Sequence, residues 1–193
     1  MDASTTSAPL LAAARELFAD RGFAEARLEE IQERAGVSTD ELSRLFPGGK
    51  EELFRAVAVR VSAETAQRVR LAAREATTPW EALERGVAAF LDASATPEVR
   101  RILLRDGPAV LATEVWRAID GDYAIALLDR VLEKAIEAGQ LPRQPTRPAA
   151  HVVLGALEEA AMTVACADDP LAARAEMGRT VERLLVGLRT PIG

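Results

Sequence analysis

The chain of 193 residues has one cysteine, one histidine and few aromatic side chains, and this scarcity excludes several classes of protein. Cys166 cannot form an internal disulfide and cannot build a zinc site alone, but it suits a reducing cytoplasm. A lone histidine such as His151 is more often structural than catalytic, and no nucleophile–base arrangement follows from the spacing. Gly48-Gly49 lacks the pattern of a phosphate-binding loop. The sequence therefore predicts no enzyme, no metal site and no cofactor.

Long apolar runs are also missing. No stretch of about 18 consecutive apolar residues occurs, so we expect no membrane-spanning helix. The first residues, MDASTTSAP, have neither the basic nor the apolar region of a secretory signal, and we expect residues 1–7 to be a disordered tail. Hydrophobic residues at 49% and charged residues at 28% describe an ordinary globular protein. The length suits one all-helical unit or two small domains that share a helix.

Residues 8–55 contain the pattern around which we interpret the rest of the chain. Apolar residues recur at helical spacing in the first segment, which Gly22 ends with a left-handed cap. A second, shorter helix covers about 28–35 and ends at Gly36.

A third helix begins at Ser38, because Ser38 and Glu41 have the spacing of a capping box. Its inward side consists of Leu42, Leu45 and Phe46. Two short helices joined by a tight turn that contains glycine predict a helix-turn-helix, whose second helix enters the major groove of DNA.

Three motifs make this prediction more specific: LLAAARELFADRGF, EEIQERAGVS and LSRLFPGGKEELFRAV. Over about a quarter of the chain they resemble the amino-terminal DNA-binding domain of TetR-family transcriptional regulators. The resemblance implies an all-α, TetR-like fold of about nine helices. It implies a DNA-binding domain at 8–55 and a ligand-binding and dimerisation domain at 56–193. The candidate DNA-binding residues are Arg27, Thr39, Ser43, Arg44 and Lys50, of which Lys50 aligns with a phosphate-contacting lysine of the family.

The surface expected to face DNA departs from the family in its residues and in its charge. The family usually has Thr where Ala26 and Arg27 stand, a small residue where Gln32 stands and often Gly where Asp40 stands. The family usually has Tyr where Ser43 stands and commonly His where Leu45 stands, and both contact phosphate. Residues 1–50 also hold six basic and nine acidic side chains, a net charge of −3, within a chain of net charge −6. Nucleic-acid binders usually present a basic face. Asp40 and Glu41 suit the first turn of a helix by capping and by the helix dipole, but they also repel phosphates.

Beyond residue 50 the sequence predicts six further helices. Thr78-Pro79 and Thr96-Pro97 are similar start signals, with a capping threonine followed by proline at the first helical position. Asp106-Gly107-Pro108 and Gly139 are expected breaks. The expected ranges are 50–76, 79 to at least 91, 97–104, 113–138, 148–167 and 170–188.

The last two predicted helices, 148–167 and 170–188, have more apolar surface than one neighbour covers, and small residues that permit close approach. This hints at a bundle completed by a second copy of the chain. The resemblance implies the same, since family members usually dimerise through these two helices. A two-fold dimer places two recognition helices about one DNA turn apart.

The larger domain also offers candidates for the lining of a small-molecule pocket. Aromatic and long aliphatic side chains lie on the helices where the family usually encloses its effector, and Asp106, Asp120 and Asp122 are candidate polar anchors. For each apolar candidate the alternative, that it only fills the core, stays open. The candidates are Trp80, Phe90, Leu103, Leu104, Trp116, Ile119, Tyr123, Leu127 and Met162.

Three functions remain to be distinguished. The leading hypothesis is a cytoplasmic, ligand-responsive repressor that binds a double-stranded DNA operator as a homodimer and responds to a small hydrophobic effector. The second is a protein of the same fold that binds a small molecule or another regulator and has lost DNA binding. The third, an enzyme on this fold, depends only on the expected pocket.

Overall fold

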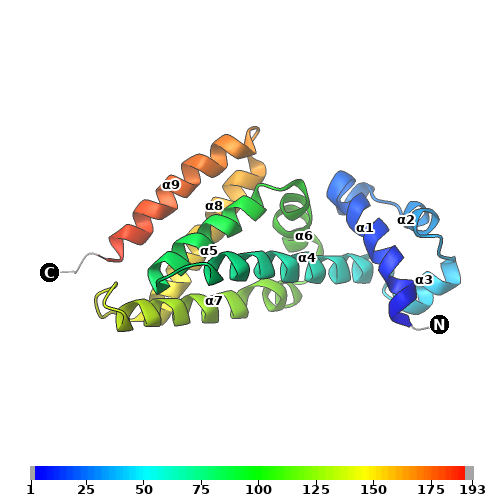
Figure 1. The fold of residues 1–193 in the computed structure, drawn as a ribbon. Coiled ribbons are helices and arrows are strands. Elements are labelled where there is room, and N and C mark those ends of the chain that lie inside the picture. The colour runs from blue at the N-terminus through cyan, green and yellow to red at the C-terminus, as the bar shows by residue number, and fades with distance from the viewer. Residues whose placement is uncertain (1–2, 190–193) are drawn as a thin grey trace. The chain divides into compact units, whose positions relative to one another are not determined.

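The computed structural model describes residues 3–189, apart from the side chains of residues 3–6, 117 and 120–123. The described chain is all-α, with nine α-helices and one π-helix (Figure 1), so the predicted fold class is confirmed. The elements are α1 (Ala3–Glu25), α2 (Leu28–Ala35), α3 (Thr39–Leu45), α4 (Gly49–Arg74), α5 (Pro79–Ser94), η1 (Val99–Asp106), α6 (Gly107–Val110), α7 (Thr113–Glu137), α8 (Thr146–Cys166) and α9 (Pro170–Gly187).

The contacts divide the chain into two compact units. The first, here the N-terminal unit, comprises the chain up to Ala63 together with Pro97–Ile119. The second, the C-terminal unit, comprises Glu64–Thr96 and the chain from Asp120 onward. Helices α4 and α7 each run from one unit into the other. The N-terminal unit is thus larger than the segment 8–55, because η1, α6 and the start of α7 join it.

The core of the N-terminal unit forms on the apolar faces that the sequence predicts. Phe18 and Phe54 are fully buried, and the ring of Phe54 meets the rings of Phe18 and Phe23 edge-on at centroid distances of 5.2 and 5.1 Å. Edge-to-face pairs of this kind add to the free energy gained by burial. They hold α1 against the start of α4 and thereby fix the base on which α2 and α3 rest.

Helix α1 differs from the prediction at its start and agrees with it at its end. It begins at Ala3, within the segment expected to be a disordered tail, and includes Pro9. At Gly22 the backbone leaves the helix, as predicted, but with φ 80° and ψ 174° in place of the left-handed helical conformation that the expected cap has. This region of backbone conformation is open essentially only to glycine.

The segment after α5 is where the predicted helix boundaries need correction. We expect a helix capped by Thr96 that ends before a break at Asp106-Gly107-Pro108. In the structure, the Thr96 hydroxyl instead donates to the Ala93 carbonyl at 2.7 Å, and a π-helix starts at Val99. It continues through Asp106 into α6, and the chain breaks only at Leu111, which has an extended backbone (φ −90°, ψ 143°).

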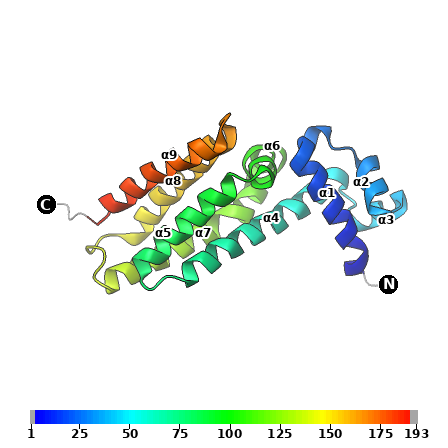
Figure 2. The ribbon, with the colours of Figure 1, turned by 45° about the horizontal axis from the view of Figure 1, so that its top comes forward.

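In the C-terminal unit, α5, α8 and α9 pack on one another, and α8 and α9 lie side by side in both views (Figures 1 and 2). Their buried apolar side chains form one cluster with Leu132 and Ala135 of α7. Of the described helices, α8 is long and apolar enough to cross a membrane by length and composition. Val153, Leu157 and Ala160 are buried in this cluster, but only 39% of the apolar window of α8 is buried, and Val152 is 66% exposed.

Candidate nucleic-acid interface

The turn between α2 and α3 has the geometry of a helix-turn-helix. Gly36 adopts a left-handed conformation with φ 65° and ψ 32°, and the amide of Val37 donates to the Gln32 carbonyl at 3.1 Å. The capping box at the start of α3 is present in full. The Glu41 amide donates to Ser38 Oγ at 3.3 Å, and the Ser38 amide donates to Glu41 Oε2 at 3.1 Å. These bonds set the direction in which α3 leaves the turn.

The capping role also accounts for the charge of Glu41. Hydrogen bonds from the Ser38 amide and then the Ser38 hydroxyl lower the pKa of the Glu41 carboxyl, and nearby Arg44 lowers it further. The carboxylate is therefore retained as a structural acceptor at the base of α3.

The outward face of α3 carries four exposed side chains, which we call the outer row: Thr39, Asp40, Ser43 and Arg44. Leu42 and Phe46 point the other way and are buried, 4% and 8% exposed. Residues three and four apart share a helix face, so the outer row is one continuous surface. Three of the five predicted DNA-binding residues, Thr39, Ser43 and Arg44, lie on it.

The other arginines of α1 and α2 are engaged in ion pairs. Arg21 Nη1 lies 2.7 Å from Glu30 Oε2, and Arg34 Nη2 lies 3.0 Å from Glu30 Oε1. The predicted DNA contact Arg27 stands at the N-cap position of α2, where its Nε is 3.7 Å from Glu29 Oε2 and both side chains are exposed. These pairs neutralise most of the positive charge that α1 and α2 carry.

Lys50, the fifth predicted contact, is held against the α1–α2 junction. Its Nζ donates to the Ala24 carbonyl at 3.2 Å and lies 4.6 Å from the centroid of the Phe23 ring. Burial lowers the pKa of Lys50, with Glu29 opposing the shift. In this geometry the ammonium stabilises the helix-turn-helix, and its predicted role at a phosphate stays a prediction.

The N-terminal unit also holds contacts that the sequence did not predict, between η1 and α1. Arg101 Nη2 donates to the Arg21 carbonyl at 2.6 Å, and Asp106 Oδ2 accepts from the Phe23 amide at 2.6 Å. Glu98 forms a two-point ion pair with Arg15. The partners are at least 80 residues apart in sequence, and no local pattern marks them. A carboxylate and a guanidinium thus hold the backbone on both sides of Gly22.

The nine predicted ligand-binding residues are divided between the two units. Leu103, Leu104, Trp116 and Ile119 belong to the N-terminal unit, where the Trp116 ring packs on Gly107. Trp80, Phe90, Leu127 and Met162 belong to the C-terminal unit. The side chain of Tyr123, like those of Asp120 and Asp122, lies outside the described residues.

Trp80 illustrates the alternative that a candidate only fills the core. Its side chain is 4% exposed, the indole N–H donates to Glu84 Oε1 at 2.6 Å, and the Arg189 guanidinium lies 5.1 Å from the ring centroid. Leu127, by contrast, is exposed. The predicted ligand contacts therefore stay a prediction.

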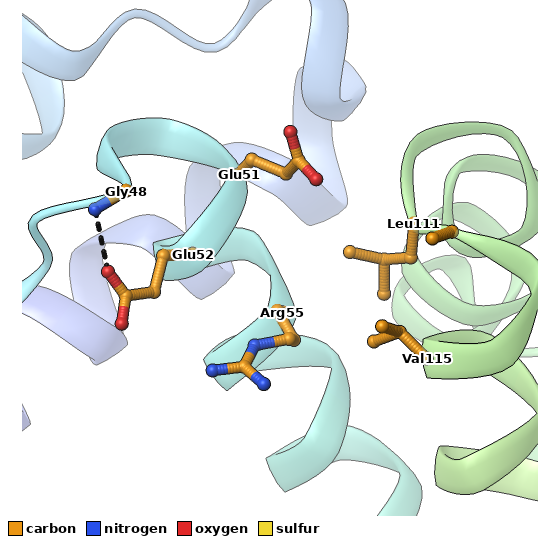
Figure 3. A pocket seen from close by; sticks show the side chains of 7 residues that line it. Gly48, Glu51, Glu52, Arg55, Leu111 and Val115 are labelled. Atoms are coloured by element: carbon orange, nitrogen blue, oxygen red, sulfur yellow. Dashed lines mark hydrogen bonds between the residues drawn. The ribbon is translucent and has the colours of Figure 1, made fainter.

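A hollow of about 390 Å³ lies within the N-terminal unit, beside the first turns of α4 (Figure 3). Leu111 and Val115 project from one side, and Glu51 and Arg55 come from α4 on the other (Figure 3). Glu52 Oε2 accepts from the Gly48 amide at 2.8 Å. None of the nine predicted ligand-binding residues lines it. Among the described residues, no group of three or more His, Cys, Asp or Glu side chains could hold a metal ion.

The fold and the outer row define a helix-turn-helix DNA-binding protein. Comparison with protein families agrees: residues 10–57 match the model of bacterial regulatory proteins of the tetR family, and residues 80–188, more than half of the chain, match the tetracyclin repressor-like C-terminal domain. The chain belongs to the TetR family of transcriptional regulators, as its motifs predict. The family is non-enzymatic, in agreement with the expected absence of an enzyme.

Individual relatives support this assignment. Over 83 residues, 43% of this chain, it is 42% identical to the HTH-type transcriptional activator FasR of Mycolicibacterium smegmatis, of which the match spans 37%. A solved TetR-family regulator from Pectobacterium atrosepticum is 28% identical, with a TM-score of 0.85 over 99% of this chain and 97% of that one. FadR from Bacillus subtilis, solved with stearoyl-CoA, shares the fold at 17% identity, with a TM-score of 0.74 over 96% of this chain and 98% of that one.

Proposed function

We propose that this regulator acts in the cytoplasm as a ligand-responsive repressor that binds its operator as a homodimer. The observation that carries the proposal is the outer row of α3. Its four side chains are exposed, stand on the element that enters the major groove in helix-turn-helix proteins, and take no part in the core. Neutral hydroxyls and a guanidinium on one face supply hydrogen-bond donors for base edges and phosphates.

The apolar surface of the last two helices supports the homodimer. Val152 on α8 is 66% exposed and Leu171 on α9 is 76% exposed, and Leu184 and Val186 are exposed as well. Exposed large apolar side chains on two neighbouring helices favour an interaction site at these helices. A second copy related by a two-fold axis covers the same face on both protomers.

A small hydrophobic effector is the third part of the proposal. FadR from Bacillus subtilis, which shares the fold, is solved with stearoyl-CoA, and this supports a ligand with a long apolar part. The effector shifts the equilibrium only if it binds the DNA-free conformation more tightly than the DNA-bound one.

DNA binding is tested by fluorescence anisotropy with labelled duplexes from the region that flanks the gene of this protein. We expect saturable binding at low salt and a weaker complex for Arg44→Ala, with Arg143→Ala, at an exposed arginine of the C-terminal unit, as a control of equal charge change outside the outer row. No binding at low salt, where phosphate contacts are strongest, would overturn the proposal.

Separate experiments test whether the protein represses or activates transcription and which compound is its effector. Repression requires only that the protein occupy promoter DNA, whereas the Mycolicibacterium smegmatis relative is an activator. In vitro transcription from the flanking promoter should therefore decrease when the protein is added, and an increase would contradict repression.

Adding stearoyl-CoA, with free coenzyme A as the control, should release the labelled duplex only if the effector is an acyl compound.

A further inference from the structure

The acidic side chain in the outer row is the feature that the proposed function leaves unexplained. Asp40 is exposed and has no hydrogen bond or ion pair with the described residues. It does not cap α3, since Ser38 and Glu41 occupy the capping box. Arg44, one turn further along, makes no ion pair with it either. The capping role thus belongs to Glu41. Asp40, in the first turn, suits the helix dipole without a hydrogen bond, so its carboxylate is free to contact a partner outside the chain.

A free carboxylate on this face accepts hydrogen bonds and is repelled by negative charge, so only a few groups of DNA can bind it. Phosphate oxygens repel it, so it is tolerated near the duplex only where a hydrogen-bond donor faces it. In the major groove the donors are the N4 amino group of cytosine and the N6 amino group of adenine. Adenine presents its N7 acceptor beside the amino group, which opposes a carboxylate and favours an amide. Cytosine presents its amino group without an adjacent acceptor on the same base.

We propose that Asp40 recognises a cytosine in each half of the operator by accepting a hydrogen bond from its N4 amino group. The inference rests on the proposed DNA binding and adds the base that one residue selects. Arg44 stands four residues further along α3, about 6 Å along the helix axis. Its guanidinium reduces the repulsion between the Asp40 carboxylate and the DNA phosphates. It also donates hydrogen bonds to a nearby guanine or phosphate. The outer row thereby favours half-sites with a C·G pair under Asp40.

The experiment is a selection from a pool of random-sequence duplexes with the full-length protein, carried out for the natural sequence, Asp40→Asn, Asp40→Ala and Glu33→Gln. The natural protein should enrich sites with cytosine at one fixed position in each half. Asp40→Asn should change the preferred base at that position to adenine, because an amide pairs with adenine N6 and N7. Asp40→Ala should lose the preference there, and Glu33→Gln should leave the selected sequence unchanged.

Fluorescence anisotropy with the selected duplex measures how much the cytosine contact adds to the affinity. Replacing the cytosine should weaken binding of the natural protein about tenfold, and of Asp40→Ala hardly at all. Identical selected sequences for all four proteins, or equally tighter binding of Asp40→Ala to every duplex, would overturn the cytosine contact while leaving DNA binding intact. If the natural protein binds no duplex, the proposed function fails as well, so the two failures are distinguishable.

Discussion

Gly22 occupies a backbone conformation that other residues avoid, and its missing side chain leaves room for Arg101. A Cβ at this position would lie 2.2 Å from Arg101 Nε, and the same guanidinium donates to the Arg21 carbonyl. The backbone conformation therefore requires glycine at this end of α1, and a side chain there would also displace the guanidinium of Arg101.

We expect Gly22→Ala to lower the free energy of unfolding by about 2 kcal/mol, since a non-glycine residue in this region costs about 1–3 kcal/mol. Urea denaturation followed by circular dichroism measures the loss. Gly36→Ala is the reference variant, because Gly36 lies in the left-handed helical region, which other residues reach at lower cost, and nothing lies within 4 Å of its Cβ position. A loss at Gly22 no larger than the loss at Gly36 would contradict the stricter requirement for glycine at Gly22.

Lys50 gives a second prediction at the scale of one residue. If the ammonium mainly holds the Ala24 carbonyl and the Phe23 ring, Lys50→Met lowers stability by about 1 kcal/mol, the typical size of these contacts. Thermal unfolding and operator affinity are measured on the same variant. A variant that keeps its stability but loses affinity would assign Lys50 to a phosphate instead.

At the scale of elements, Thr78 and Thr96 explain what the sequence could and could not predict. Both precede proline, but only Thr78 accepts the amide of a glutamate three residues on, Glu81, at 3.1 Å. After Thr96 the corresponding residue is Val99, and Glu98 pairs with the distant Arg15. Local hydrogen bonds fix many helix ends, which is why the starts of α3, α5 and α9 and the end of α2 at Gly36 were predicted. The start of η1 depends on tertiary contacts, which no local pattern contains.

The same limit applies to the candidate interface. The side of α3 that carries Thr39, Ser43 and Arg44 follows from the period of its apolar residues, and the structure agrees. The environment of Lys50 and the free carboxylate of Asp40 were not predicted. The free carboxylate depends on which of the two neighbouring acids, Asp40 or Glu41, completes the capping box. The environment of Lys50 depends on the tertiary packing of α1 against the start of α4.

The start of α5 makes a pH-dependent prediction. Hydrogen bonds from the Thr77 amide, the Thr77 hydroxyl and Arg85 lower the pKa of Glu81 from 4.5 to about 2. Because the folded-state pKa is depressed, the stabilisation is fully present above about pH 4.5 and is lost as the pH falls towards 2.

We therefore expect Glu81→Gln to be less stable than the natural protein at pH 6 and to approach it between pH 4.5 and 2. Urea denaturation over this range provides the measurement, and Glu133→Gln on α7 is the charge-matched control. A stability difference that does not change between pH 6 and pH 3 would contradict the assignment.

At the scale of the whole molecule, the proposed dimer gives a test of assembly. Val152→Glu or Leu184→Glu places a charge on the face that a second copy is expected to cover, and should convert the protein to monomers in sedimentation velocity. Val59→Glu is the matched control, since Val59 is 48% exposed but lies on α4. If all three variants sediment as the natural protein does, α8 and α9 are not the interface.

Ion pairing within α1 and α2 also predicts how salt acts on DNA binding. If Arg27 and Arg44 of two protomers neutralise about four phosphates, the logarithm of the binding constant falls with the logarithm of salt concentration with a slope of about −3.6. Anisotropy titrations over a range of salt concentrations measure this slope. A slope twice as steep would require further basic side chains at the DNA phosphates, such as Lys50 after it has left the Ala24 carbonyl.

The separation between the outer row and the cap beneath it has a practical consequence. Thr39, Asp40, Ser43 and Arg44 take no part in the core, and Asp40 and Arg44 contribute to α3 only through its dipole and the Glu41 carboxylate, while Ser38, Glu41 and Leu42 hold the helix in place. Libraries that randomise these four codons should yield folded variants at high frequency. The protein is therefore a convenient starting point for DNA-binding proteins with new sequence preferences.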